Sequence, residues 1–303
     1  MKILILGYSN LFRKRILDVF LKEKIKFSIA SKSKAQKDIK AYKWFRDYNI
    51  ALRKSDANVV YISLSNSLHY KWAKKALEKN FHVIVDKPIA LKFKDILTLL
   101  KLAKKKKVLL AEATFFNYHC QFIKALKLIK NKKNINYINT NFIIPTPLKN
   151  SFRMKKKSGG GCLHDMSAYA AATARLLSSG KLLSFQSNIF KNDKGLVTSF
   201  SVSCKFQKNY YFGYFCFGGE YKNNMILYSK EKYIELNNVF SPPSDKQLKI
   251  LIKNKNQLRV EKTSKDNVFR NYFYEIKKSL QDNKFQSFYD KILIDAKFKN
   301  KLK

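Results

Sequence analysis

Short apolar runs alternate with longer amphipathic stretches along the first third of the chain. The runs have the length and composition of buried strands, and the stretches between them carry apolar residues at helical spacing. Near-continuous apolar strands separated by helices predict a parallel sheet that is covered on both faces. The predicted strands are Ile3–Leu6, Phe27–Ala30, Val59–Ile62, Val83–Val85 and Val108–Leu110.

The pattern changes near Asn134, where longer strand-like runs joined by turn-rich segments begin. These runs predict a mostly antiparallel sheet, with one helix inside it and one after it. The predicted strands are Ile135–Ile144, Val197–Phe206, Tyr210–Phe217 and Met225–Tyr228, and the predicted helices are Asp165–Leu177 and Val268–Leu280. We therefore expect a two-domain α/β protein, with a parallel-sheet domain over residues 1–116 and an α+β domain with an open sheet over residues 117–303.

Length and composition agree with two domains, because 303 residues with 46% hydrophobic side chains exceed the usual size of one domain. Lys and Arg number 62 against 21 Asp and Glu, a formal charge of +41 that by itself favours a polyanionic partner such as nucleic acid. Arg is scarce among these cations, and Lys is the poorer residue for bidentate recognition of bases and phosphates. We therefore expect a solvated basic surface and no nucleic-acid partner; a gel shift at physiological salt separates the two.

The cysteines indicate a reducing environment. Cys120, Cys162, Cys204 and Cys216 never approach CxxC spacing and lack His-rich neighbours, so we expect neither a zinc site nor a disulfide framework. The apolar run after Lys2 is too short for a signal peptide, and no window approaches the ~20 apolar residues of a membrane span. We expect a soluble, cytoplasmic chain that binds no metal and no membrane.

The turn after the first strand carries part of a dinucleotide-binding fingerprint. Gly7 stands at the first glycine position, whereas Ser9 and Phe12 occupy the second and third. The glycines of this motif make a tight turn, admit the pyrophosphate and let the helix pack on the strand. Ser9 is small and can donate a hydrogen bond, but Phe12 must splay the helix or turn aside. We expect Gly7, Ser9, Asn10 and Leu11 to contact a dinucleotide, although an ordinary strand-turn-helix explains this motif alone equally well.

The second predicted strand ends in Ser31-Lys32-Ser33-Lys34. Proteins that bind NAD hold its ribose hydroxyls with an acidic residue at this place. A hydroxyl beside cations suits a 2′-phosphate instead, and no carboxylate is there to repel it. We therefore predict NADP(H) in preference to NAD(H), with Ser31 and Lys32 as contacts. The alternative is that the lysines begin a solvated helix in a lysine-rich chain.

Polar residues also follow the third predicted strand. An amphipathic helix is predicted from Tyr70 to Lys79, with Asn66 or Ser67 as its N-cap. The N-terminus of this helix is expected to face the cofactor crevice, since ligands of parallel sheets bind beyond the carboxyl ends of the strands. We expect Ser65, Asn66 and His69 to lie at the cofactor, and His69 to serve in packing or capping more than in catalysis.

The fourth predicted strand ends in Asp86-Lys87-Pro88. A buried strand that ends in this way places a cation at the mouth of the crevice, and Pro88 restricts the backbone so that the position of Lys87 is defined. Asp86 and Lys87 are therefore expected beside the cofactor.

Three glycines at 159–161 precede Asp165 and Tyr169 in the second half. The glycines predict a flexible loop that allows close approach of backbone, and Asp165 then opens a helix. Asp165 and Tyr169 are four residues apart, so both project from one helix face, an arrangement suited to proton transfer. Taken alone, the motif is better explained by an Asp near a helix start with Tyr169 as core filling.

Together these motifs resemble the glucose-fructose oxidoreductase and inositol dehydrogenase (Gfo/Idh/MocA) family. Its members carry Asn and His before the third helix and Glu-Lys-Pro after the fourth strand, where this chain has Asn66, His69 and Asp86-Lys87-Pro88. The segment from Glu112 to Gln121 is similar to the family's Glu-Ala segment ending in His-Pro-Gln, with Cys120 in place of Pro.

The glycine loop extends the resemblance into the second half. The family's Gly-Gly-Gly-x-x-x-Asp-x-Gly-x-(His/Tyr) motif matches residues 159–169, with Ser167 for the last Gly. The resemblance implies a Rossmann-type dinucleotide-binding domain, a substrate-binding domain, and an active site of Lys87, Asp165 and Tyr169. Arg153 precedes the glycine loop as in many members, and Arg153 and Asn117 are expected to contact substrate.

The resemblance implies an NAD(P)-dependent oxidoreductase that moves a hydride between nicotinamide and a hydroxyl or keto carbon of a sugar, cyclitol or nucleotide sugar. Cations at Arg153 and Lys155–Lys157 favour a phosphorylated or nucleotide-linked sugar. Lys87 would polarise the reacting oxygen and Tyr169 would exchange its proton, but the sequence leaves open which of the two is the proton donor. The competing class is a non-catalytic, regulatory dinucleotide-binding protein, suggested by the missing glycines. We also expect a homodimer or homotetramer that forms through the second sheet.

Overall fold

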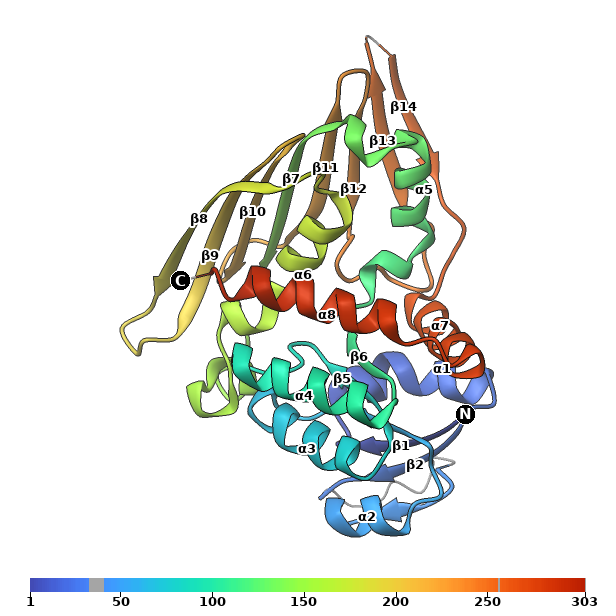
Figure 1. The fold of residues 1–303 in the computed structure, drawn as a ribbon. Helices are drawn as coiled ribbons and strands as arrows, with labels where there is room; N and C mark the ends of the chain where they lie inside the picture. Colours follow the sequence, from blue (N-terminus) through green and yellow to red (C-terminus); the bar gives the residue numbers. More distant parts are fainter. Residues whose placement is uncertain (33–40, 256, 303) are drawn as a thin grey trace. The chain divides into compact units, whose positions relative to one another are not determined.

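The computed structural model describes residues 1–32, 41–255 and 257–302 (Figure 1). The chain forms two compact units. Unit 1 contains Met1–Ala113 and Phe273–Leu293, and unit 2 contains Thr114–Tyr272 and the residues from Ile294 onward. All four cysteines are free thiols.

Unit 1 is built on a six-stranded sheet with the order β3-β2-β1-β4-β5-β6, in which every pair is parallel. This is the order of a dinucleotide-binding Rossmann domain. The central strands are almost wholly buried, as their continuous apolar sequences predicted. The strands are β1 Lys2–Leu6, β2 Lys26–Ala30, β3 Trp44–Phe45, β4 Val59–Ile62, β5 His82–Asp86 and β6 Leu110–Ala113.

The helices of unit 1 connect successive parallel strands, and α3 packs beside α4 (Figure 1). Apolar side chains recur on one face of each, so burial of that face against the sheet stabilises the helix. The helices are α1 Leu17–Lys22, α2 Tyr48–Lys54, α3 Asn66–Glu78 and α4 Phe93–Lys106. Parts of α7 (Val268–Asp282) and α8 (Gln286–Lys299) also belong to unit 1, where Phe273 contacts Phe20 and Tyr61.

Two predicted boundaries in unit 1 were wrong. Helix α3 begins at Asn66, not Tyr70, and its N-cap is Ser65, which makes no side-chain capping bond. Asn66 and Ser67 therefore lie in the first turn, and His69 enters the helix instead of preceding it. The last strand begins at Leu110, because Val108 is taken up by the end of α4, where its N–H donates to Ala103 O.

Unit 2 is an α+β unit with an eight-stranded sheet of order β14-β13-β12-β11-β7-β10-β9-β8. All neighbours are antiparallel except the pair β7 and β10. The predicted α/β fold class with a mostly antiparallel second sheet is confirmed. The strands are β7 Ile135–Ile144, β8 Leu182–Lys191, β9 Val197–Phe206, β10 Tyr210–Phe217, β11 Lys222–Ser229, β12 Tyr233–Asn237, β13 Lys249–Asn254 and β14 Gln257–Lys262.

Helices α5 (Cys120–Ile129) and α6 (Cys162–Leu177) lie on one face of this sheet (Figure 1). Contacts of α6 with β9 and β10, and of α5 with β12 and β13, close the core of unit 2. Helix α6 is alanine-rich, and its small side chains allow it to pack closely on the sheet. Edge strands β8 and β14 escaped prediction because they are largely exposed and carry no continuous apolar run.

Within the described residues, every helix is either too short or too polar to cross a bilayer.

Candidate active site

The turn after β1 places backbone where a dinucleotide-binding fold needs it. Gly7 has φ of +100°, and a Cβ on it would lie 2.3 Å from the carbonyl oxygen of Ser63. Only glycine fits this position, because the left-handed backbone and the close approach both exclude a side chain. Gly7 therefore forms the tight turn that the first fingerprint glycine makes in this fold.

Ser9, at the second fingerprint position, is the start of a partly buried chain of hydrogen bonds. Its Oγ accepts from Phe12 N–H at 3.1 Å and lies 2.6 Å from Ser63 Oγ. Ser63 in turn donates to Asp86 Oδ2 at 2.6 Å. Because that bond uses the single hydroxyl proton of Ser63, Ser9 is the donor between the two serines. The hydroxyl proton of Ser9 is thus directed at Ser63.

Phe12, at the third fingerprint position, is too large for the close helix packing that a glycine allows, and the backbone around it is changed locally. Its side chain is fully buried among Tyr8, Phe20, Phe27 and Tyr61, with ring centroids 5.7–6.4 Å apart. Residues 12–16 form a π-helical turn, which is wider than an α-helical one. The expectation that Phe12 splays the helix or turns aside is met by this widened turn.

The remaining predicted residues of this turn lie at the helix start. Asn10 Oδ1 accepts from Arg13 Nη2 at 2.7 Å on an exposed edge. Leu11 precedes the π-helical turn and makes no side-chain cap.

Asp86 is the last residue of β5, and hydrogen-bond donors contact both of its carboxylate oxygens. Its carboxylate accepts hydrogen bonds from Tyr61 Oη and from Ser63 Oγ, one on each oxygen. Burial raises the pKa of Asp86 above its ordinary value, although the two hydrogen bonds and the charges of His69 and Lys87 oppose this shift. Lys87 follows directly, half-buried, and its peptide bond to Pro88 is cis. Asp86 and Lys87, the predicted site residues in this part of unit 1, therefore lie at the end of β5.

His69 is completely buried in the first part of α3. Its Nδ1 lies 2.7 Å from Pro88 O, and its Nε2 lies 3.0 Å from Leu64 O. Ser65 caps this helix and Asn66 is buried in its first turn. The ring thus spans the ends of β4 and β5.

The carboxyl end of β2 carries two of the predicted cofactor contacts. Ser31 is buried, and its N–H donates to Phe45 O at 2.9 Å; Lys32 is exposed. Ser33 and Lys34 lie outside the described residues. The residue after Phe45 is Arg46, an exposed cation that sequence reasoning missed because β3 is only two residues long. The pairing of β2 with β3 places Arg46 beside the end of β2.

In unit 2, the glycine loop supports an ion pair. A Cβ on Gly160 would lie 2.4 Å from Arg153 O, and Gly161 N–H donates to the same oxygen at 2.7 Å. Arg153 Nε is 3.0 Å from Asp165 Oδ2, and the Asp165 side chain is 8% exposed against 42% for Arg153. The loop is a close backbone junction, where flexibility was expected. Helix α6 starts at Cys162, so Asp165 lies inside its first turn.

Tyr169 lies one turn along α6 from Asp165. Its half-buried ring contacts Phe116, Phe142 and Phe240 with centroid separations of 5.1–6.2 Å. Asn117, in the 3₁₀ turn Phe116–Tyr118, is half-buried as well. An aromatic cluster therefore fixes the body of the phenol.

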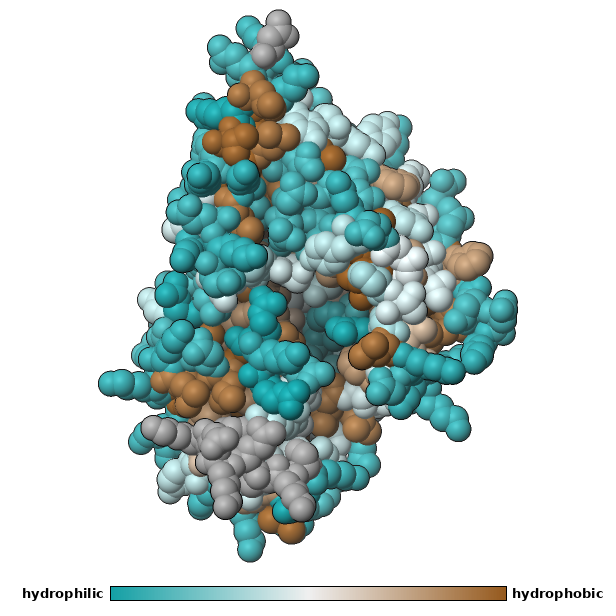
Figure 2. Space-filling model, turned by 180° about the vertical axis from the view of Figure 1, so that it is seen from behind, coloured by the Kyte–Doolittle hydropathy of each residue, from teal (hydrophilic) through white to brown (hydrophobic). Residues whose placement is uncertain are grey.

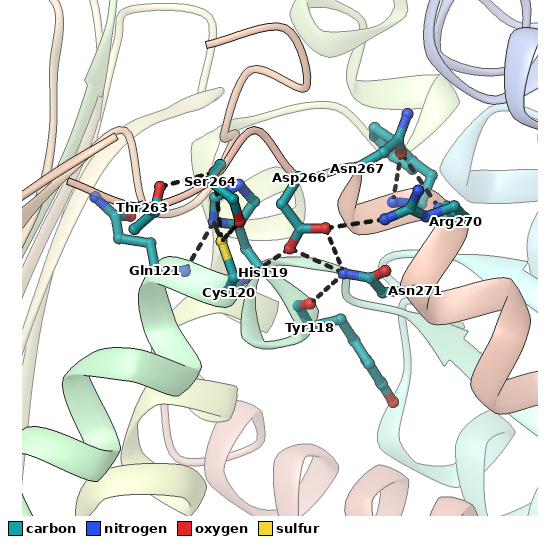
Figure 3. A network of polar contacts seen from close by, with 11 residues as sticks. Tyr118, His119, Cys120, Gln121, Thr263, Ser264, Asp266, Asn267, Arg270 and Asn271 are labelled. Atoms are coloured by element: carbon teal, nitrogen blue, oxygen red, sulfur yellow. Dashed lines mark hydrogen bonds and ion pairs between the residues drawn. The ribbon is translucent and has the colours of Figure 1, made fainter. Parts of the chain in front are cut away.

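A further polar network joins the start of α5 to the segment before α7 (Figure 3). Asp266 accepts from Cys120 N–H at 2.7 Å and from Asn271 Nδ2 at 2.9 Å, and it pairs with Arg270 at 3.5 Å. His119 caps α5, with its Nδ1 accepting from the backbone of the helix. Ligand atoms of His119, Cys120 and Asp266 lie within 4.8 Å of one another. Donors and the Arg270 cation already occupy the Asp266 carboxylate, which favours a structural role for this network, whereas His119 Nε2 is buried without a hydrogen-bond partner among the described residues.

Comparison with known proteins bears on the unit that carries Gly7 and Lys87. Residues 1–114 match the family model GFO_IDH_MocA, described as an oxidoreductase family with an NAD-binding Rossmann fold. The resemblance drawn from Asn66, His69 and Asp86-Lys87-Pro88 is thereby confirmed.

Two curated relatives of this chain carry names of sugar oxidoreductases. A dTDP-3,4-didehydro-2,6-dideoxy-alpha-D-glucose 3-reductase from Saccharopolyspora spinosa is 28% identical over 69% of this chain and 64% of its own length. The D-xylose 1-dehydrogenase (NADP(+)) 2 of Haloferax volcanii is 25% identical over 44% of this chain and 41% of its own length. The chain thus spans less than two thirds of the curated relatives it matches.

Solved structures share the whole fold. A 3-ketoreductase from Actinomadura kijaniata, in complex with NADP and TDP-benzene, superposes with a TM-score of 0.92 over 100% of this chain and 96% of its own, at 19% identity. An aldose-aldose oxidoreductase from Caulobacter crescentus superposes with a TM-score of 0.85 over 98% and 94%, at 15% identity. At such identities the likeness establishes the architecture of both units.

Proposed function

We propose that this chain is an NADP(H)-dependent oxidoreductase that transfers a hydride between nicotinamide and a carbinol or keto carbon of a nucleotide-linked sugar. The observation that carries the proposal is the end of β5, where Asp86 is held by Tyr61 and Ser63 and Lys87 follows it. In a parallel sheet, this is the edge beyond which ligands bind. Gly7 makes the tight turn that the first glycine of a dinucleotide-binding motif makes, because Ser63 O leaves no room for a side chain there.

We assign Lys87 and Tyr169 different roles at the reacting oxygen of the substrate. When bound, the nicotinamide supplies the hydride donor or acceptor. In the reducing direction Lys87 donates a hydrogen bond to the substrate carbonyl, and Tyr169 delivers the proton that the new hydroxyl needs. In the oxidising direction Tyr169 takes that proton back. The aromatic cluster around Tyr169 keeps its phenol in one place while the proton moves.

The preference for NADP(H) rests on the carboxyl end of β2. Ser31 and Lys32 occupy it, and Arg46 stands beside it through the pairing of β2 with β3. A guanidinium at this place can donate two parallel hydrogen bonds to the 2′-phosphate. An Arg46→Ala variant should weaken NADPH binding at least tenfold, roughly the loss of one charge-assisted contact, and leave NADH binding unchanged.

The choice of a nucleotide-linked substrate rests on Arg153. The guanidinium of Arg153 is partly exposed and paired with Asp165, which fixes its orientation. Its remaining N–H groups can donate hydrogen bonds to a diphosphate. Exposed cations at Lys155–Lys157 add positive potential to the same loop. Asp165 therefore positions Arg153 in this scheme. Equal kcat/KM on a free sugar and on its nucleotide-linked form would overturn this part of the proposal.

The decisive experiment is a turnover assay on NADPH with a panel of keto sugars and nucleotide-linked keto sugars, followed by the loss of reduced nicotinamide absorbance. Lys87→Ala should reduce kcat by at least about 100-fold, because a positioned donor at the developing charge is removed. Lys92→Ala is the matched control, since Lys92 is exposed in the same segment. Tight NADPH binding without turnover on any member of the panel would favour the regulatory alternative.

We also propose that the chain self-associates through the sheet of unit 2. The upper part of the surface seen from behind is mostly hydrophilic with separate apolar patches (Figure 2). The sheet exposes large apolar side chains at Leu183, Phe190, Tyr210, Phe212 and Leu258. Burial of such residues stabilises oligomers. Phe212→Lys should lower the mass measured by sedimentation, whereas Leu148→Lys, in an exposed loop, should not.

A further inference from the structure

His69 occupies an unusual position among the buried side chains of unit 1. The ring is 0% exposed, and both of its nitrogens face backbone carbonyl oxygens, Pro88 O at 2.7 Å and Leu64 O at 3.0 Å. A carbonyl oxygen only accepts hydrogen bonds, so each nitrogen must donate. A neutral imidazole carries one N–H, whereas the imidazolium carries two.

We propose that His69 is an imidazolium clamp, a positioning residue that ties the Lys87–Pro88 peptide to the loop after β4. A neutral ring would bring a nitrogen lone pair against one of the two carbonyl oxygens and leave that oxygen without its donor. The charged ring satisfies both oxygens at once.

The counter-charge for the clamp lies nearby. Asp86 accepts hydrogen bonds on both carboxylate oxygens, from Tyr61 and Ser63, which is the pattern of an ionised group. Burial raises the pKa of the Asp86 carboxyl, and the charge of His69 opposes that shift. A buried cation is tolerated when it is hydrogen-bonded and faces an opposite charge. His69 is hydrogen-bonded at both nitrogens, and its charge interacts with that of Asp86.

The clamp bears directly on Lys87. The lysine stem begins between the Asp86 carboxylate, which is held by β4, and the Pro88 carbonyl, which is held by His69. Both flanking groups are anchored, so the origin of the flexible Lys87 side chain is fixed at the end of β5. This consequence for catalysis rests on the proposed function; the charge on the ring does not.

The charge can be read directly by ¹⁵N NMR of the full chain labelled at histidine, without cofactor at pH 7. The chain has four histidines, and His69→Gln assigns the signal of interest. We expect two protonated ring nitrogens for His69. One protonated and one unprotonated nitrogen would overturn the clamp, whatever the enzyme assay shows.

Kinetics then test the effect on Lys87. His69→Leu removes both donors, and displacement of the reacting group by about 1 Å can cost roughly 100-fold in kcat. We expect that loss with KM for NADPH unchanged, and partial recovery in His69→Gln, whose amide keeps N–H donors without charge. His82→Gln is the matched control, because His82 lies at the opposite end of β5 and accepts from Leu109 N–H.

A folded His69→Leu variant with normal kcat would overturn the positioning role. If the Leu variant does not fold, His69→Gln carries the test, and a kcat equal to wild type would show that the charge is dispensable. Wild-type protein without any turnover would refute the proposed function, and the NMR result would still decide the state of the ring.

Discussion

Restoring the glycine missing from the third fingerprint position should strongly destabilise unit 1 instead of improving its cofactor site. Phe12 is fully buried and touches four aromatic rings. Removing a buried Phe side chain costs about 3–5 kcal/mol, and Gly in place of Ala within a helix costs about 1 kcal/mol more. Phe12→Gly should therefore lose about 4–6 kcal/mol, against a typical total stability of ~5–15 kcal/mol.

Urea unfolding followed by tryptophan fluorescence measures this loss in the right unit, because both tryptophans, Trp44 and Trp72, lie in unit 1. Phe12→Ala separates the cavity from the backbone contribution. Ser9→Gly restores the other missing glycine and should cost about 1 kcal/mol, since it removes the hydrogen bonds of Ser9 with Ser63 and with Phe12 N–H. Phe12→Gly with near-normal stability and tighter NADPH binding would refute the reasoning.

Three further results are expected. Gly160→Ala should lower the melting temperature and the turnover together, since its Cβ would lie 2.4 Å from Arg153 O; an unchanged melting temperature would contradict the close junction. Burial lowers the pKa of His164, so its stabilising contribution is present above pH 6.5 and is lost as the pH falls through its lowered pKa. Wild type should therefore lose up to ~1.4 kcal/mol more per pH unit below pH 6.5 than His164→Gln, and parallel urea curves would argue against this. Burial raises the pKa of Cys204 to about 12, so iodoacetamide at pH 8 should spare this thiol until the chain is denatured; rapid native labelling, read by peptide mass spectrometry, would contradict it.

Several strands of both sheets follow from local pattern, although β12 and β13 inside the second sheet were not predicted. Val59–Ile62, Ile135–Ile144 and Tyr210–Phe217 were predicted with the bounds that the structure has. Edge strands such as β8 and β14 could not be predicted in this way, because they bury little and their hydrogen-bond partners are distant in sequence. The start of α3 was misplaced because Asn66 and Ser67 favour caps, whereas here the tertiary contacts of His69 hold them inside the helix.

The sequence by itself determined which chemical groups stand at the ends of the strands. Lys87 could be placed at the end of a buried strand from the sequence alone, since parallel strands expose their carboxyl ends at one edge. Arg153 and Asp165 could likewise be placed on the two sides of a glycine loop. Only the tertiary structure decided what these groups touch. In the structure Ser9 is hydrogen-bonded to Ser63, and Arg153 forms an ion pair with Asp165. The pairing of β2 with β3 places Arg46 beside the end of β2, and the His69 ring lies between two carbonyl oxygens. The physical reason is that hydrogen bonds and ion pairs depend on distances of a few ångströms between residues far apart in the chain, and spacing along a sequence does not encode such distances.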